Sequence, residues 1–152
     1  MAFVLDSSIA CAWAFHDEDH PHAELALDRV RNEETAFVPS LFWYELRNVL
    51  IVRERSGRIR EAETSAFLRD IAILNIAPDL APDEAEVLRL ARRHRLSVYD
   101  AVYLELAMRK QIELATLDKA LVAACRRDNV PLVADDHINP TRKNKKSQSH
   151  DD

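Results

Sequence analysis

Phe3-Val4-Leu5-Asp6 is a short, continuous apolar run that ends at an acidic residue. Similar runs occur at Ala36-Phe37-Val38, which Pro39 closes, and at Glu113-Leu114-Ala115-Thr116. Runs of this length without alternation of polar and apolar residues predict strands that are buried on both faces. Because helical patterns separate these runs, the sequence predicts an α/β protein in which helices cover both faces of a parallel sheet.

Helical patterns fill most of the remaining chain. Two predicted helices are marked by their ends: Ser40 is expected to cap a helix that runs to about Ser56 and stops at Gly57, and Ser97 one that runs to about Lys110. Further helices are expected over residues 8–15, 21–32 and 59–72, from Pro82 to about His94, and from Lys119 to Arg127; two more short strands are expected at 74–76 and 131–133.

The chain of 152 residues fits one domain, and hydrophobic residues at 47% with charged residues at 31% are ordinary for a globular protein. We expect this domain to span residues 1–138. Residues 139–152 are polar and lack periodicity, which predicts a flexible tail. The tail contains a basic run, residues 142–146, for which a solvated tail is favoured over contact with nucleic acid.

Composition excludes several classes of protein. A protein that coats DNA regardless of sequence is expected to be basic, so the formal net charge of −5 excludes this class. The charge does not exclude an enzyme that acts on RNA and concentrates its acidic residues at a metal site. The single glycine, Gly57, excludes a P-loop and a dinucleotide-binding glycine motif. The N-terminus does not resemble a signal peptide, and no apolar stretch approaches the ~18 residues of a membrane span, so we expect a cytoplasmic protein. Cys11 and Cys125 are expected to be reduced.

Three acidic residues have simple structural explanations when each is taken alone. Asp6 and Asp118 follow predicted strands and could cap the helices after them. Asp100 lies three residues after Ser97, which resembles a capping box. For each of these residues alone, capping is the favoured interpretation.

Glu45 is harder to explain in this way. On its predicted helix it shares a stripe with Leu41, Val49 and Val52, at i−4, i+4 and i+7. A carboxylate that faces inward is costly unless it has a partner, so the sequence predicts either a metal or an ion pair with an arginine. Asp100 resembles Glu45 in this respect, because apolar residues lie on its helix face: Tyr103, Leu104 and Ala107.

The four acidic residues are expected to meet. Asp6 and Asp118 both follow strands, and the carboxyl ends of parallel strands share one edge of the sheet, where binding sites form. Glu45 and Asp100 lie in the first turns of helices that could face this edge. Four converging carboxylates would repel one another without a cation, and their oxygens suit Mg²⁺ or Mn²⁺.

Four short motifs occur in a fixed order: Val4-Leu5-Asp6-x-Ser8, Glu45-Leu46-x-Asn48-Val49-Leu50, Tyr99-Asp100-Ala101-x-Tyr103-Leu104 and Ala115-Thr116-Leu117-Asp118. Together they resemble the PIN-domain family, and within it the VapC-type toxin ribonucleases of bacterial type II toxin–antitoxin systems. The resemblance covers residues 1 to about 135. Each motif is weak by itself, but their order and spacing are specific.

The resemblance implies a fold, a site and partners. The fold would be a three-layer α/β/α sandwich around a parallel sheet. The family's four acidic positions match Asp6, Glu45, Asp100 and Asp118, and its small hydroxyl residues near the site match Ser8 and Thr116. The activity would be metal-dependent endonucleolytic cleavage of RNA, restrained by a cognate antitoxin, in a protein expected to form homodimers.

These implications assign a role to each residue. Asp6, Asp100 and Asp118 are expected to bind Mg²⁺ or Mn²⁺ directly or through water, and Glu45 to bind the metal or to orient the attacking water. The hydroxyls of Ser8 and Thr116 are expected to hydrogen-bond the carboxylates or the metal's waters. The alternative from another class is a non-catalytic, PIN-like module that binds RNA or protein.

Overall fold

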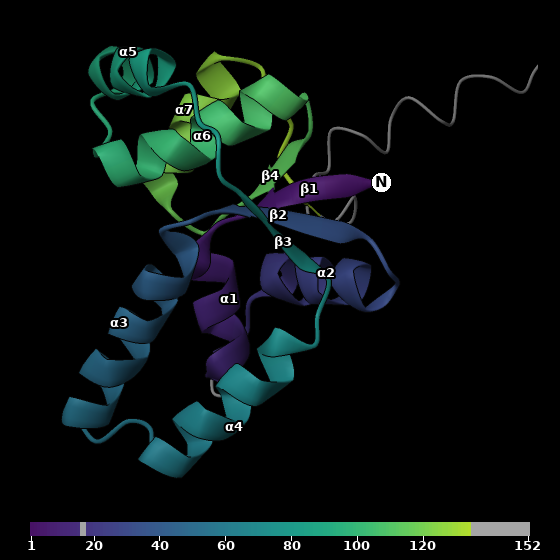
Figure 1. Ribbon diagram of the computed structural model, residues 1–152, viewed down its shortest axis with the longest axis vertical. Helices are drawn as coiled ribbons and strands as arrows, with labels where there is room; N and C mark the ends of the chain where they lie inside the picture. Colours follow the sequence, from purple (N-terminus) through teal and green to yellow (C-terminus); the bar gives the residue numbers. More distant parts are fainter. Residues whose placement is uncertain (16–17, 135–152) are drawn as a thin grey trace, which may run out of the picture.

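The computed structural model describes residues 1–15 and 18–134, which form a parallel sheet between two layers of helices (Figure 1). The strands are β1 (Ala2–Leu5), β2 (Thr35–Pro39), β3 (Ile76–Asp79) and β4 (Glu113–Ala115), in the order β3-β2-β1-β4. All neighbouring strands pair in parallel. The predicted α/β/α sandwich is therefore confirmed. The predicted tail, 139–152, and residues 135–138 of the predicted domain lie outside the described residues.

The helices divide between the two faces of the sheet. They are α1 (Ser7–Ala14), α2 (Pro21–Arg31), α3 (Phe42–Arg55), α4 (Glu61–Ala72), α5 (Glu84–His94), α6 (Val98–Lys110) and α7 (Lys119–Arg127). Figure 1 shows α5, α6 and α7 on one side of the sheet and α1 to α4 on the other. None of the helices within the described ranges is long and apolar enough to cross a membrane.

Strand β1 separates two hydrophobic cores. Phe3 and Leu5 pack with α1, α2 and α3, whereas Val4 packs with α5, α6 and α7, because successive side chains of a strand point to opposite faces. All three residues are fully buried, as the continuous apolar run predicts. Each such side chain contributes about 1.5–3 kcal/mol through burial.

Two of the predicted strands differ from the structure. The strand expected at 74–76 is β3, which begins only at Ile76 and continues through Pro78 to Asp79. A proline fits there because β3 lies at the edge of the sheet and pairs with β2 alone. The strand expected at 131–133 was wrong: this segment forms one isolated bridge to β4, between Leu132 and Leu114. Pro131 has no N–H to extend the pairing.

Two helix starts were also predicted at the wrong residue. Ser40 does not cap α3, because the backbone of Leu41 is already helical and its carbonyl accepts the first hydrogen bonds of the helix. Helix α5 begins behind Asp83 rather than at Pro82, and the Asp83 side chain accepts a hydrogen bond from the Glu86 N–H at 3.1 Å. The cap at Ser97 is confirmed by a 3.1 Å hydrogen bond from the Asp100 N–H.

Gly57 follows α3 with a φ of 76°, as a helix stop requires. Both cysteines are free, with Cys125 buried and Cys11 partly exposed. This agrees with the expectation that they are reduced.

A buried acidic residue ties α6 to its neighbours. Glu105 is 1% exposed, and its Oε1 accepts hydrogen bonds from the Arg109 Nε at 2.7 Å and from the Asp83 N–H at 3.2 Å. Arg109 also donates to Asp79, the last residue of β3. This network fixes both the start of α5 and the edge strand to α6.

We expect Glu105→Ala to lower the free energy of unfolding by about 1–3 kcal/mol, because the Asp83 N–H loses its acceptor and the Arg109 guanidinium loses one of its two carboxylate partners. Urea unfolding followed by circular dichroism measures this change. Glu86→Ala is the matched control, since Glu86 forms an exposed ion pair with Arg89, and it should cost less than about 0.5 kcal/mol. Equal losses in the two variants would show that the network contributes no more than a surface pair.

Candidate metal centre

Asp6 lies where the carboxyl ends of β1 and β4 meet. Its backbone N–H donates to the Ala115 carbonyl at 3.0 Å, and the residue is only 4% exposed. Although Asp6 holds the N-cap position of α1, its side chain makes no capping hydrogen bond. Capping therefore does not explain this carboxylate.

Two hydroxyl groups hold one oxygen of Asp6. The Ser8 Oγ donates to the Asp6 Oδ2 at 2.6 Å, and the Thr116 Oγ1 donates to the same atom at 2.7 Å. Each hydroxyl in turn accepts a backbone N–H at 3.0 Å, Ser8 from Leu117 and Thr116 from Asp118. The hydroxyl protons are thereby directed toward Asp6, and the turn after β4 is coupled to the carboxylate.

Asp118 and Asp100 lie at the N-terminal ends of two helices, at the same edge of the sheet. The Asp118 Oδ1 accepts from the Leu121 N–H at 2.9 Å, so this residue does cap α7 while its other oxygen takes no part in the cap. Asp100 lies in the first turn of α6 and is half-buried. Its helix face is buried as predicted, at Tyr103, Leu104 and Ala107.

Glu45 lies in the first turn of α3, and the apolar stripe predicted for it is confirmed only in part: Leu41 and Val49 are partly buried and pack against the two cores, but the stripe is not the centre of the buried face. Val52 is 50% exposed, and the buried face of α3 instead comprises Phe42, Leu46 and Leu50. Glu45 precedes Leu46 and so lies about 100° around the helix, on the flank of the buried face. Its side chain is accordingly half-buried.

Glu45 has a tyrosine partner that the sequence analysis missed, besides a weaker contact with the Ser7 side chain. The Tyr103 hydroxyl donates to the Glu45 Oε1 at 2.6 Å. The predicted alternative, an ion pair with an arginine, is not found for Glu45 among the described residues. One signal pointed to Tyr103: a hydroxyl on a buried helix face needs a hydrogen-bond partner.

Burial and mutual repulsion disfavour the ionised carboxylates. Burial raises the pKa of Asp6; the hydroxyls of Ser8 and Thr116 oppose this, and the charges of Asp100 and Asp118 add to it. Burial, opposed by the Tyr103 hydrogen bond and assisted by Asp6 and Asp100, raises the pKa of Glu45 to about 7. The pKa of Asp100 is raised by burial and then by Asp118.

Each of the four acidic residues therefore lies close enough to at least two of the others to interact electrostatically. None of them has an ion pair in the part of the chain that the structure describes, so their combined charge lacks a cationic partner there. Carboxylate and hydroxyl oxygens suit a hard divalent cation such as Mg²⁺ or Mn²⁺.

The four carboxylates do not form a complete coordination site in the positions that the structure gives them. Across residues 1–15 and 18–134, no three acidic, histidine or cysteine side chains are grouped tightly enough to hold a metal ion as they stand. The donor chemistry fits such an ion, but simultaneous direct coordination by three of the carboxylates would require side-chain movement. Ligation through water would require less movement.

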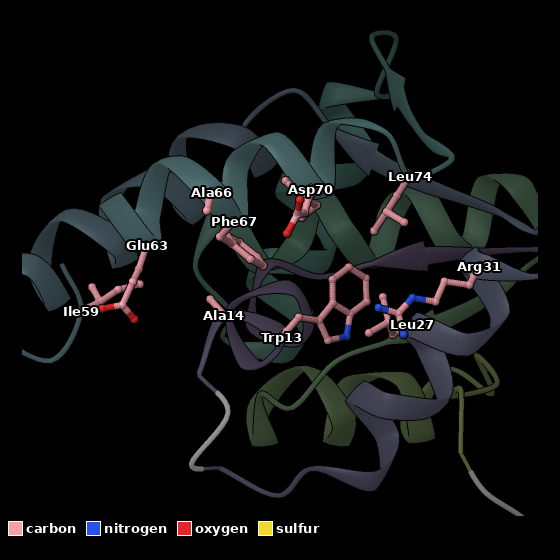
Figure 2. Close-up of a pocket in the computed structure, with 11 residues that line it drawn as sticks. Trp13, Ala14, Leu27, Arg31, Ile59, Glu63, Ala66, Phe67, Asp70 and Leu74 are labelled. Carbon is pink, nitrogen blue, oxygen red and sulfur yellow. The ribbon is translucent and has the colours of Figure 1, made fainter. Parts of the chain in front are cut away.

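A separate cavity of about 340 Å³ lies between α1, α2 and α4 (Figure 2). Trp13 and Phe67 form part of its wall, and its charged lining residues are Arg31, Glu63 and Asp70. The four acidic residues of the candidate metal centre do not line it. The candidate chemistry is therefore at the edge of the sheet and not in this cavity.

The raised pKa values predict how stability depends on pH. The ionised form of Glu45 is disfavoured in the folded chain, so the protonated side chain favours folding. This stabilisation is fully present below the usual glutamate pKa of 4.5 and is lost as the pH rises through about 7. In thermal unfolding without metal, Glu45→Gln should therefore gain stability relative to wild type between pH 5 and 8.

Mn²⁺ should raise the unfolding temperature of the wild type more at pH 8 than at pH 5.5, because the ligands must be deprotonated. Scanning calorimetry at both pH values, with and without Mn²⁺, measures both effects. An equal Mn²⁺ shift at the two pH values would contradict the assignment of carboxylate ligands.

A parallel α/β sheet with carboxylates gathered at its carboxyl edge defines a class of proteins that bind their ligands or metals at that edge. Within this class the chain belongs to the PIN-domain family, whose model matches residues 3–129. Ribonuclease VapC3 from Pyrobaculum aerophilum is 34% identical over 125 residues, which are 80% of this chain and 92% of that protein. The resemblance found in the sequence motifs is confirmed.

Solved structures agree with this fold. A crystal structure of PAE2754 from Pyrobaculum aerophilum matches with a TM-score of 0.65 and 25% identity, covering 82% of this chain and 84% of that one. VapBC2 from Rickettsia felis, solved with a DNA fragment from its promoter, matches with a TM-score of 0.60 and 17% identity, covering 87% and 97%. VapC20 from Mycobacterium tuberculosis, a toxin that cleaves the sarcin–ricin loop, matches with a TM-score of 0.56 and 16% identity, covering 80% and 94%.

Proposed function

We propose that this chain is a Mg²⁺- or Mn²⁺-dependent endoribonuclease and the toxin of a toxin–antitoxin pair. The observation that carries the proposal is the cluster of four carboxylates at one sheet edge, with raised pKa values at Asp6, Glu45 and Asp100 and no cationic partner among the described residues. Membership of the PIN-domain family and similarity to ribonuclease VapC3 support RNA as the substrate.

Each residue has a proposed task. Asp6, Asp100 and Asp118 hold the cation directly or through water. When bound there, a divalent cation lowers the pKa of water and offsets the charge that develops on the phosphate. Glu45 contributes a further ligand or orients the attacking water. Ser8 and Thr116 keep the Asp6 carboxylate in one orientation.

The proposal includes partners and a location. A cognate antitoxin would restrain the nuclease, in keeping with the resemblance to VapC toxins. Homodimer formation and a cytoplasmic location are proposed on the same basis.

The test is RNA cleavage by the purified full chain with Mg²⁺ or Mn²⁺, followed by analysis of the product ends. We expect internal cuts without 2′,3′-cyclic phosphates, because water and not the ribose 2′-hydroxyl attacks the phosphorus. Cyclic phosphate ends would contradict the proposed mechanism. RNA that is bound but never cut with either metal would favour the non-catalytic binding module, an alternative consistent with the absence of a tight ligand group from the described residues.

A further inference from the structure

The hydrogen bond between Tyr103 and Glu45 joins the two helical layers of the molecule. Glu45 comes from α3, on one face of the sheet, and Tyr103 comes from α6, on the other. Tyr103 lies three residues after Asp100 on α6, so this helix contributes both an acidic residue and the hydroxyl that contacts another acidic residue. The hydrogen bond therefore lies at the candidate metal centre, although Tyr103 carries no carboxylate.

The direction of this hydrogen bond is fixed by chemistry. Burial, followed by the negative charge of Asp6 and the bond to Glu45, raises the pKa of Tyr103, so the phenol keeps its proton. A protonated phenol beside a carboxylate donates, and the 2.6 Å separation from the Glu45 Oε1 is in the range of charge-assisted O–H···O⁻ bonds. One of the two Glu45 oxygens is therefore committed to Tyr103.

The two side chains differ in how firmly the fold holds them. Tyr103 is 0% exposed and belongs to the core between α5, α6, α7 and the sheet. Glu45 is half-buried at the flank of α3, and a glutamate loses substantial rotamer freedom when it is held in one place. The rigid partner is thus the tyrosine, and the glutamate is the group that it orders.

We propose that Tyr103 is a positioning residue that fixes the Glu45 carboxylate at the metal centre. Without the hydroxyl, the Glu45 carboxylate would still be present but would no longer be held in one position. The water or cation that it contacts would then be misaligned. Small displacements of a reacting group cost much of the rate. The inference rests on the proposed nuclease function.

The test is steady-state kinetics of Tyr103→Phe on an RNA oligonucleotide with Mg²⁺. This variant removes only the hydroxyl and keeps the ring that fills the core. We expect kcat to fall about 10–100-fold, the effect of losing a group that orients a ligand, while KM for RNA changes less than about twofold. Tyr44→Phe is the matched control, because Tyr44 precedes Glu45 but is 78% exposed, and it should behave as wild type.

A double-mutant cycle separates positioning from a general structural role. If Tyr103 acts through Glu45, Tyr103→Phe should have little further effect on kcat in a Glu45→Gln background. A similar fold-loss in both backgrounds would overturn the inference. Metal-free crystal structures give a readout that does not depend on activity: the Glu45 carboxylate should be displaced or lose its single position in Tyr103→Phe, and an unchanged position would also overturn it.

The failure of this inference is distinguishable from the failure of the proposed function. A wild-type chain that cuts RNA beside an equally active Tyr103→Phe would remove only the role of Tyr103. A wild-type chain that leaves RNA intact with Mg²⁺ and Mn²⁺ would overturn the nuclease proposal, and the positioning role with it.

Discussion

Asp100→Asn is expected to abolish RNA cleavage while the protein stays folded. Asparagine has nearly the shape of aspartate but carries no charge and turns an N–H₂ donor toward the cation, so a ligand is lost with little change in packing. We expect kcat to fall by about 10²–10³-fold or more, the scale set by removing one group that stabilises a transition state. A fluorogenic RNA substrate with Mg²⁺ measures this loss.

The folded state of this variant should not suffer. The Ser97 cap of α6 uses the Asp100 backbone N–H and is retained, and one repelling charge is removed. Asp70→Asn is the matched control, because Asp70 is exposed on α4 and lines the separate cavity. Turnover like that of wild type by a folded Asp100→Asn protein would remove Asp100 from the centre.

Removal of divalent metal should have an effect of similar size. EDTA is expected to reduce RNA cleavage to background, and an excess of Mg²⁺ or Mn²⁺ to restore it, since Asp6, Glu45, Asp100 and Asp118 have no ion pair among the described residues to balance their charge. The two cores that flank β1 are built from packed hydrophobic side chains, so the chain should stay folded in EDTA. Circular dichroism in the same buffer is the control.

Full activity in EDTA would contradict a metal-dependent mechanism. It would favour a mechanism in which a pair of histidines acts as acid and base, as a metal-free ribonuclease normally requires.

The sequence predicted those parts of the fold and the site that a local pattern determines. Phe3-Val4-Leu5 has no polar residue because it is buried on both faces. The edge shared by Asp6 and Asp118 follows from where β1 and β4 end. The buried face around Asp100 likewise follows from helical periodicity.

The remaining features depend on contacts between distant segments. Strand β3 is an edge strand containing Pro78, so it lacks the apolar run of a central strand. The stripe predicted for Glu45 lies at the margin of the buried face, with Val52 exposed, because the spacing of Leu41, Val49 and Val52 does not reveal which side of α3 the sheet covers. The bond from Tyr103 to Glu45 spans 58 residues, and no spacing within one helix reveals such a contact.

The central claim is that Asp6, Asp100 and Asp118 hold a catalytic divalent cation. Anomalous diffraction from crystals soaked in Mn²⁺ tests it most directly, because the signal locates the metal without reference to activity. We expect a Mn²⁺ peak among these three carboxylates, at direct or water-bridged distance, that disappears in Asp100→Asn crystals. Bound Mn²⁺ elsewhere in the chain, with no peak at this edge of the sheet, would contradict the claim.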